Sequence, residues 1–154
     1  MIEVRRGRSE DASALAEVWL RVRRAAVPVI PAPVHTDAEV RDWFASVVLR
    51  SHEVWVAEQG GEVVGLLVLD GEELDQLYVD PSRQGEGIGA RLLDRAKEQR
   101  SAGLALWTFA ANVGARRFYE RHGFVVTGGT DGDNEEGAPD IRYEWRPERP
   151  VSRG

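Results

Sequence analysis

The most informative stretch of this chain is Arg83-Gln84-Gly85-Glu86-Gly87-Ile88-Gly89. An apolar run at residues 74–79 comes before it and predicts a strand, and helical spacing over residues 87–102 predicts a helix after it. Glycines at alternate positions let a backbone approach a ligand without a clash from Cβ. The helix start adds unpaired N–H groups and the positive end of the helix dipole, so this turn suits a pyrophosphate. The alternative is a flexible turn that merely contains glycines.

Further strand and helix patterns extend on both sides of this turn. Ser9 is expected to cap the first helix, Thr36 and Glu39 form a capping box for the second, and Gly60-Gly61 indicates a hairpin. Strands are expected at residues 2–5, 54–57, 63–69, 74–79, 104–109, 124–127 and 141–145, and helices at residues 9–26, 36–48, 87–102 and 112–122. The order β-αα-βββ-α-β-α-ββ predicts an α/β domain with a mixed sheet (α+β). It differs from the doubly wound fold that binds dinucleotides.

Composition narrows the possible functions. The 154 residues fit one domain, which we expect at residues 1–146, with a flexible tail at residues 147–154. The net charge of −6 argues against a nucleic-acid partner. The chain has no cysteine, which excludes disulfides, thiolate zinc sites and a cysteine nucleophile. With no apolar run long enough for a bilayer and no signal peptide, we expect a cytoplasmic protein with no membrane partner and no metal.

Two motifs in this sequence resemble those of the GNAT superfamily of acyl-CoA-dependent N-acyltransferases. Residues 84–89 match the signature Q/R-x-x-G-x-G/A, and Leu77-Tyr78-Val79-Asp80-Pro81 looks like the family's fourth strand and its exit. Asn112, Ala115, Phe118-Tyr119-Glu120 and Gly123-Phe124 then follow the pattern N-x-x-A-x-x-F-Y-E-x-x-G-F. The resemblance covers residues 53–126 and implies the GNAT fold, with acetyl-CoA as the cosubstrate.

The resemblance also implies where coenzyme A would lie. Main-chain groups of Leu77, Tyr78 and Val79 would hold the pantetheine arm. The pyrophosphate would lie on the backbone N–H groups of Gln84, Gly85, Glu86, Gly87, Ile88, Gly89 and Ala90. The Glu86 side chain must then point away from the phosphates. Asn112 would reach the pantetheine or the acceptor through its amide, a role compatible with capping the helix that follows.

Tyr119 is the candidate for the acid chemistry. When an amine attacks the thioester, coenzyme A leaves as a thiolate whose pKa is about 8.5. A phenol with a pKa of about 10 can donate a hydrogen bond or its proton to that sulfur. A half-buried tyrosine that only packs beside Phe118 is the alternative, and the resemblance to the F-Y-E motif favours the catalytic role.

A carboxylate on the strand before the glycine turn is the candidate base. Strand side chains alternate, so Glu73, Asp75, Leu77 and Val79 should share one face, and Glu73 fits best the base that relatives often carry on this strand. The alternative places Glu73 in a solvated turn. His35, in the loop between the first two helices, is a weaker candidate, and a chain without a dedicated base is also possible.

The acceptor site implied by the resemblance lies between the loop at residues 27–35 and the loop at residues 128–140. The second loop is strongly acidic and would favour a cationic acceptor; the alternative is a solvated hairpin. The candidate acceptor residues are His35, Asp75, Glu135 and Glu136, and Trp19, Arg23 and Trp43 are less specific candidates.

The resemblance therefore implies an acetyl-CoA-dependent N-acetyltransferase. Its acceptor would be a primary amine of a cationic small molecule or a protein, which attacks directly in a ternary complex. The alternative is a non-catalytic acyl-CoA-binding or sensing domain with a partner at the acidic loop. Dimers are common in the family that the sequence resembles, and the apolar residues of the final strands allow a homodimer without requiring it.

Overall fold

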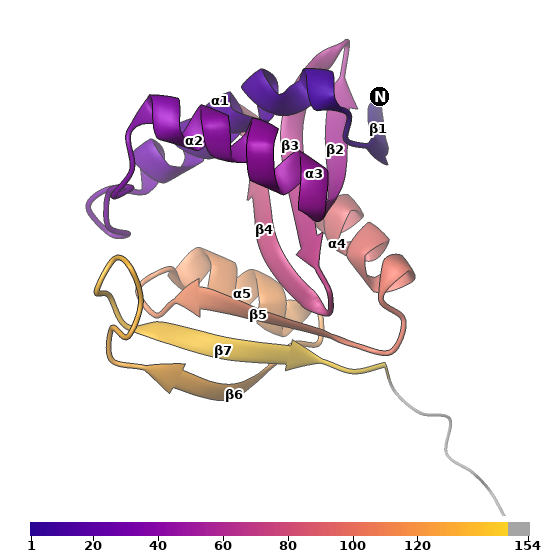
Figure 1. Cartoon of the computed structure of the whole chain (residues 1–154). Helices are drawn as coiled ribbons and strands as arrows, with labels where there is room; N and C mark the ends of the chain where they lie inside the picture. The colour runs from indigo at the N-terminus through magenta and orange to yellow at the C-terminus, as the bar shows by residue number, and fades with distance from the viewer. Residues whose placement is uncertain (148–154) are drawn as a thin grey trace, which may run out of the picture.

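The computed structural model describes residues 1–147, which fold around one seven-stranded sheet (Figure 1). Its strand order is β1-β2-β3-β4-β5-β7-β6, and all neighbouring strands are antiparallel except β4 and β5. The strands are β1 Ile2–Arg6, β2 Glu53–Gln59, β3 Glu62–Asp70, β4 Glu73–Val79, β5 Leu104–Phe109, β6 Val125–Thr130 and β7 Asp140–Trp145. Residues 148–154, which belong to the expected tail, lie outside the described residues.

Helices cover both faces of the sheet (Figure 1). They are α1 Ala12–Ala26, α2 Asp37–Trp43, α3 Leu49–Ser51, α4 Ile88–Gln99 and α5 Val113–Arg121, with short helical turns at Ser9–Asp11, Phe44–Val48 and Pro81–Arg83. On one face α1 and α2 bury Leu15 and Val40 against Leu66 of β3. On the other face α4 and α5 bury Leu92 and Tyr119 among neighbours that include Leu67. The predicted fold class and order of elements are confirmed.

The helix starts test the predicted caps. The Thr36 capping box is confirmed, because Glu39 N donates to Thr36 Oγ1 at 3.1 Å and Thr36 N donates to Glu39 Oε1 at 2.9 Å. The expected cap at Ser9 is wrong, because Ser9 lies inside the helical turn that precedes α1. Asp11 stabilises this start instead: its carboxylate accepts from Arg8 N at 2.7 Å and pairs with Arg5 at 2.9 Å.

The join between β4 and β5 positions the site. These strands are paired in register only at Glu73 and Ala105, and Ala105 N donates to the Glu72 carbonyl at 3.1 Å. Beyond this point they diverge, as Figure 1 shows. Between β3 and β4 the register shifts, so that Leu69 faces Leu74, Val68 faces Gln76, and Asp75 forms a β-bulge. The main chain of β4 that faces the gap is therefore left without a neighbouring strand.

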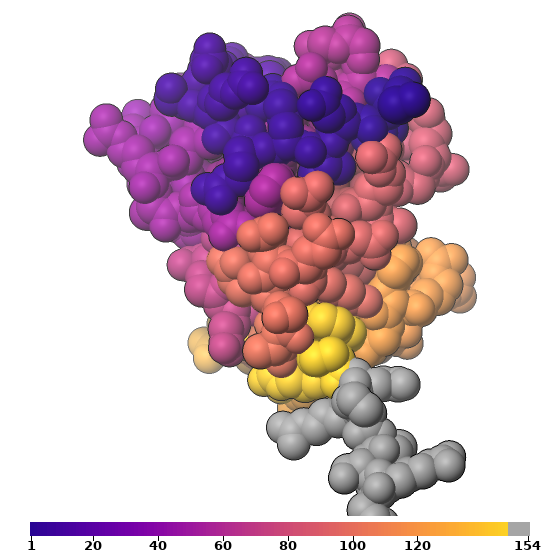
Figure 2. Space-filling view, turned by 90° about the vertical axis from the view of Figure 1, so that its right-hand side faces the viewer, coloured from indigo at the N-terminus to yellow at the C-terminus, as the bar shows by residue number. Residues whose placement is uncertain are grey.

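Helix α4 closes the face of the molecule that lies opposite α1. Figure 2 shows α4 in salmon at the centre, with the N-terminal part of the chain in indigo above it and the last strand in yellow below it. Its inward side chains, Ile88, Leu92, Leu93 and Ala96, are almost completely buried. Among residues 1–147, no helix has the length and apolar character needed to cross a membrane.

Candidate active site

An open cleft of about 1200 Å³ lies where β4 and β5 separate. It reaches from the glycine turn and α5 on one face of the sheet to the end of α1 and the β6–β7 loop on the other. The predicted site residues that line it are Asp75, Leu77, Tyr78, Val79, Gln84, Gly85, Gly87, Ile88, Gly89, Ala90, Asn112, Tyr119 and Glu136. The predicted site residues outside its lining are His35, Glu73, Glu86 and Glu135.

The glycine turn has the backbone that an anion site needs. Gly85 and Gly87 have φ angles of +85° and +80°, in the left-handed region that favours glycine. Gly87 caps α4 without any side-chain hydrogen bond. The N–H groups of the first helical turn therefore remain free for a ligand. They lie at the positive end of the helix dipole, beside the cleft. Glu86 is exposed and does not line the cleft, which is compatible with a side chain that points away from bound phosphates. These residues fit a pyrophosphate.

The side chains of β4 point to different faces of the sheet. Leu77 and Val79 pack against the core under α4 and α5. Tyr78 packs on the α1 side, where its ring lies edge-on to Trp19 with centroids 6.3 Å apart. Between them, the main-chain groups on the open edge of β4 face the cleft. This arrangement can hold an extended amide-containing chain such as a pantetheine arm by hydrogen bonds of the sheet type.

Tyr119 lies at the inner wall of the cleft. Tyr119 is 7% exposed. Its ring packs edge-on against the rings of Phe118 and Phe124, with centroids 5.3 and 5.4 Å apart. Burial raises the pKa of its phenol above the ordinary value, so the hydroxyl stays protonated at neutral pH. Within the described chain this hydroxyl makes no hydrogen bond that affects its pKa, so it is available to donate to a ligand in the cleft.

Asn112 holds the start of α5 beside the cleft. Its Oδ1 accepts a hydrogen bond from Ala115 N at 3.1 Å, so the expected role as helix cap is confirmed. The residue also lines the cleft. The amide oxygen of Asn112 is therefore bound to the helix, and this bond fixes the orientation of the amide NH₂.

The two carboxylates of β4 do not share a face, contrary to the expectation. The bulge at Asp75 interrupts the alternation, so that Leu74 rather than Glu73 packs with Leu77 in the core. Both carboxylate oxygens of Glu73 are bound by Arg142 of β7 in a two-bond ion pair. Asp75 lines the cleft, and desolvation there raises the pKa of its carboxyl. Within residues 1–147, no group of three or more His, Asp or Glu residues could hold a metal ion.

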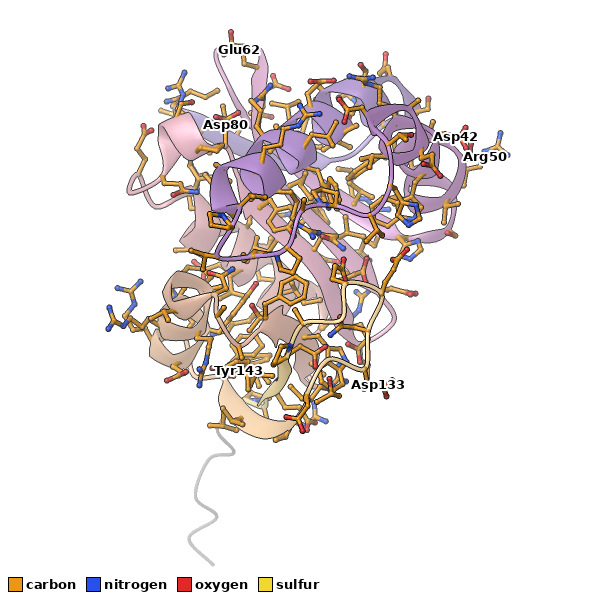
Figure 3. The ribbon with its side chains drawn as sticks, turned by 90° about the vertical axis from the view of Figure 1, so that its left-hand side faces the viewer. Asp42, Arg50, Glu62, Asp80, Asp133 and Tyr143 are labelled. Atoms are coloured by element: carbon orange, nitrogen blue, oxygen red, sulfur yellow. The ribbon has the colours of Figure 1, made fainter. Side chains whose placement is uncertain are left out.

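The acidic β6–β7 loop is tied to the segment around the end of α1. The Nε2 atom of His35 lies 2.5 Å from Glu135 Oε1, and Nη2 of Arg23 lies 3.6 Å from Glu136 Oε1. The pairing with Glu135 raises the pKa of His35. Figure 1 shows the two loops at the same side of the molecule, and Figure 3 labels Asp133 on the acidic loop. Glu135 and Glu136 are therefore already paired within the chain, which weakens the expectation that they bind a cationic acceptor.

Two residues of the cleft had no firm assignment from the sequence. Gln76 lines the cleft and accepts a hydrogen bond from Trp19 Nε1 at 3.1 Å. Arg23 also lines the cleft and is 6% exposed. Its signal was present in the sequence, because it follows Trp19 by four residues and therefore lies on the buried face of α1.

Comparisons with known proteins agree with this geometry. The profile of the acetyltransferase (GNAT) domain family matches residues 50–126. The peptidyl-lysine N-acetyltransferase YjaB of Salmonella typhimurium strain LT2 is 33% identical over 135 residues, covering 87% of this chain and 90% of that protein. The solution structure of apo YjaB from Escherichia coli has a TM-score of 0.76 and 28% identity, covering 94% of this chain and 97% of that one.

A ligand-bound structure shares the fold as well. The crystal structure of the PaiA N-acetyltransferase from Thermoplasma acidophilum in complex with coenzyme A has a TM-score of 0.69, covering 95% of this chain and 99% of that one. Its identity of 19% supports a common fold alone. The family profile and the extended match to YjaB establish more, namely that this chain is an acyltransferase of the acetyl-CoA-dependent GNAT acetyltransferase family.

Proposed function

We propose that this protein transfers an acetyl group from acetyl-CoA to a primary amine, with a lysine side chain as the first candidate acceptor. The observation that carries the proposal is a continuous cleft, which joins the glycine turn and Tyr119 to the loops beside α1. A donor and an acceptor can therefore meet in one ternary complex. YjaB of Salmonella typhimurium is described as a peptidyl-lysine N-acetyltransferase, which supports a lysine amine.

Each end of the cleft has its own task in this proposal. Acetyl-CoA supplies an activated acyl group as a thioester. The N–H groups from Gln84 to Ala90 bind its pyrophosphate, and the open edge of β4 binds its pantetheine arm. Tyr119 donates a hydrogen bond or its proton to the sulfur that leaves as a thiolate. The raised pKa of Tyr119 keeps the phenol protonated, so that its hydroxyl can donate a hydrogen bond to the thiolate.

The acceptor amine must lose a proton before it can attack. With a lysine-like pKa near 10.4, reaching the neutral amine at pH 7 costs about 4–5 kcal/mol. In this proposal Asp75 accepts that proton, directly or through water, because it lines the cleft and its pKa is raised. The sequence favoured Glu73 for this role. The ion pair with Arg142 argues for Asp75 instead, since both Glu73 oxygens are occupied.

Replacing Asp75 by asparagine should lower kcat by about 100-fold with little change in the affinity for coenzyme A. A base must be deprotonated to act, so the wild-type rate falls as the pH drops through the raised pKa of Asp75. In Asp75→Asn that part of the pH profile should disappear. Steady-state release of the coenzyme A thiol between pH 5 and 9, at saturating acceptor, measures both effects.

Glu73→Gln is the matched control for this prediction. It removes a charge two residues away and breaks the pair with Arg142, so we expect lower thermal stability and nearly unchanged kcat. If Glu73→Gln instead abolished the low-pH limb and Asp75→Asn retained it, the base would be Glu73.

The proposed function itself is tested by mixing acetyl-CoA with a panel of amines, including lysine derivatives and lysine-containing peptides, and following thiol release. We expect release that depends on the amine and acetylated products detectable by mass spectrometry. Tight binding of coenzyme A without transfer to any amine would refute the proposal and favour the sensing domain.

A further inference from the structure

The guanidinium of Arg23 is buried at the α1 side of the cleft, and one of its N–H groups has no partner in the described structure. Its Nη2 donates to the Pro31 carbonyl at 3.2 Å. Its Nε is buried with no hydrogen-bond partner in the described structure. The nearest carboxylate, Glu136, lies 3.6 Å away, beyond the distance of a good hydrogen bond.

This arrangement is unusual for a buried charge. A guanidinium has five N–H donors, and buried charges are normally paired and fully hydrogen-bonded. Here aromatic rings supply part of the surroundings, with the Trp19 and Phe109 rings centred 5.0 and 5.8 Å from the guanidinium carbon. These rings and the Tyr78 side chain, which also contacts Arg23, hold the guanidinium at the wall of the cleft. The site is therefore preorganised for a planar, negatively charged partner.

The position of Arg23 indicates which substrate supplies that partner. The phosphates of coenzyme A are accounted for by the glycine turn, which begins α4 on the opposite face of the sheet. Arg23 comes from α1 and packs beside Tyr78, whose ring points to the α1 side. A group bound by Arg23 therefore belongs to the acceptor.

We propose that Arg23 binds a carboxylate carried by the same acceptor molecule as the amine that is acetylated, and that Glu136 occupies this place until the acceptor arrives. The inference rests on the proposed N-acetyltransferase function and names the class of amine that the cleft selects. The carboxylate takes the two-bond geometry that Glu136 does not reach. Glu136 therefore competes with the acceptor, so removing its charge should strengthen acceptor binding.

The experiment compares lysine derivatives that differ only in the carboxylate. Nα-acetyl-lysine keeps the carboxylate and Nα-acetyl-lysine amide lacks it, and kcat/KM for thiol release is measured for both with wild-type protein. We expect a preference of about tenfold or more for the carboxylate, expressed mainly in KM. A pair of peptides with Glu or Gln next to the lysine distinguishes a protein acceptor from a small molecule. A higher kcat/KM for the Glu peptide indicates a protein acceptor, and equal values for the two peptides indicate a small molecule.

Three variants test the role of Arg23. Arg23→Gln should reduce the preference to about onefold, and Arg23→Lys, which keeps the charge but not the two-bond geometry, should retain part of it. Glu136→Gln should lower KM for Nα-acetyl-lysine. Arg24→Gln is the control, because Arg24 is the next residue of α1, is exposed and pairs with Asp37. It should leave the preference unchanged.

The outcomes separate this inference from the proposed function. Thiol release at equal kcat/KM for both derivatives, or a preference that survives in folded Arg23→Gln, overturns the carboxylate site while the acetyltransferase proposal stands. A purely structural Arg23–Glu136 pair predicts that Glu136→Gln raises KM or lowers stability, and that result also overturns the inference. The absence of release with any amine contradicts the proposed function itself.

Discussion

Tyr119→Phe should lower kcat by about 100-fold while leaving the dissociation constant for coenzyme A almost unchanged. The substitution removes one hydroxyl and keeps the ring that packs against Phe118 and Phe124. Since that hydroxyl makes no hydrogen bond within the described chain that affects its pKa, its loss costs the fold little. The leaving thiolate loses its hydrogen-bond donor, so the chemical step slows. Stopped-flow or steady-state thiol release, together with calorimetry of coenzyme A binding, separates the two quantities.

A second tyrosine provides a matched control. Tyr143 is fully buried, its ring centroid lies 6.3 Å from that of Tyr119, and its hydroxyl donates to Glu120 at 2.6 Å. Tyr143 does not line the cleft. Tyr143→Phe should therefore lower the melting temperature and leave kcat nearly intact. Unchanged kcat in Tyr119→Phe with every accepted amine would remove the proposed role of Tyr119.

Gly87→Val should weaken coenzyme A binding by at least about tenfold. A non-glycine residue at the left-handed φ of +80° costs about 1–2 kcal/mol, and a β-branched residue is worse placed there. The turn relieves this strain by changing the directions of the N–H groups that begin α4. Several weak contacts must converge on one anion, so a small rotation of the turn loses much of the binding. Calorimetric titration with coenzyme A measures the loss.

Gly71→Val imposes a similar strain at a different place. Gly71 has a φ of +59° in the turn before β4, and, like Gly87, it has open space where a Cβ would lie. It is at the opposite end of β4 from the glycine turn and outside the cleft lining. We expect a comparable loss of stability in both variants and weaker coenzyme A binding only in Gly87→Val. Equal effects on binding would mean that strain anywhere in the domain explains the result.

The features that the sequence predicted well depend on neighbours along the chain. The Thr36–Glu39 capping box joins residues three apart, and the Asn112 cap on Ala115 has the same spacing. The left-handed turn at Gly85 and Gly87 is likewise a local property of glycine. The predicted cap at Ser9 is an exception to these local rules. The Asp11 carboxylate, which pairs with Arg5, accepts a hydrogen bond from Arg8 N at this helix start instead.

The choice between the two β4 carboxylates was beyond any local rule. Strict alternation placed Glu73 and Asp75 on one face, but pairing with β3 inserts a bulge that only the partner strand can specify. Arg142, which occupies Glu73, comes from β7 near the end of the chain. The sequence also could not show that the acidic loop is paired within the chain. Its partners, His35 and Arg23, come from distant segments.

The sequence by itself determined the order of strands and helices, the glycine turn and the motifs of the family, because each depends on residues that lie a few positions apart. The tertiary structure decided which charged groups enter the cleft. Arg23 and Glu136 meet only because α1 and the β6–β7 loop are brought to the same end of the gap between β4 and β5. Charge pairing acts through space, so the chemistry of the acceptor side depends on the folded chain rather than on spacing along it.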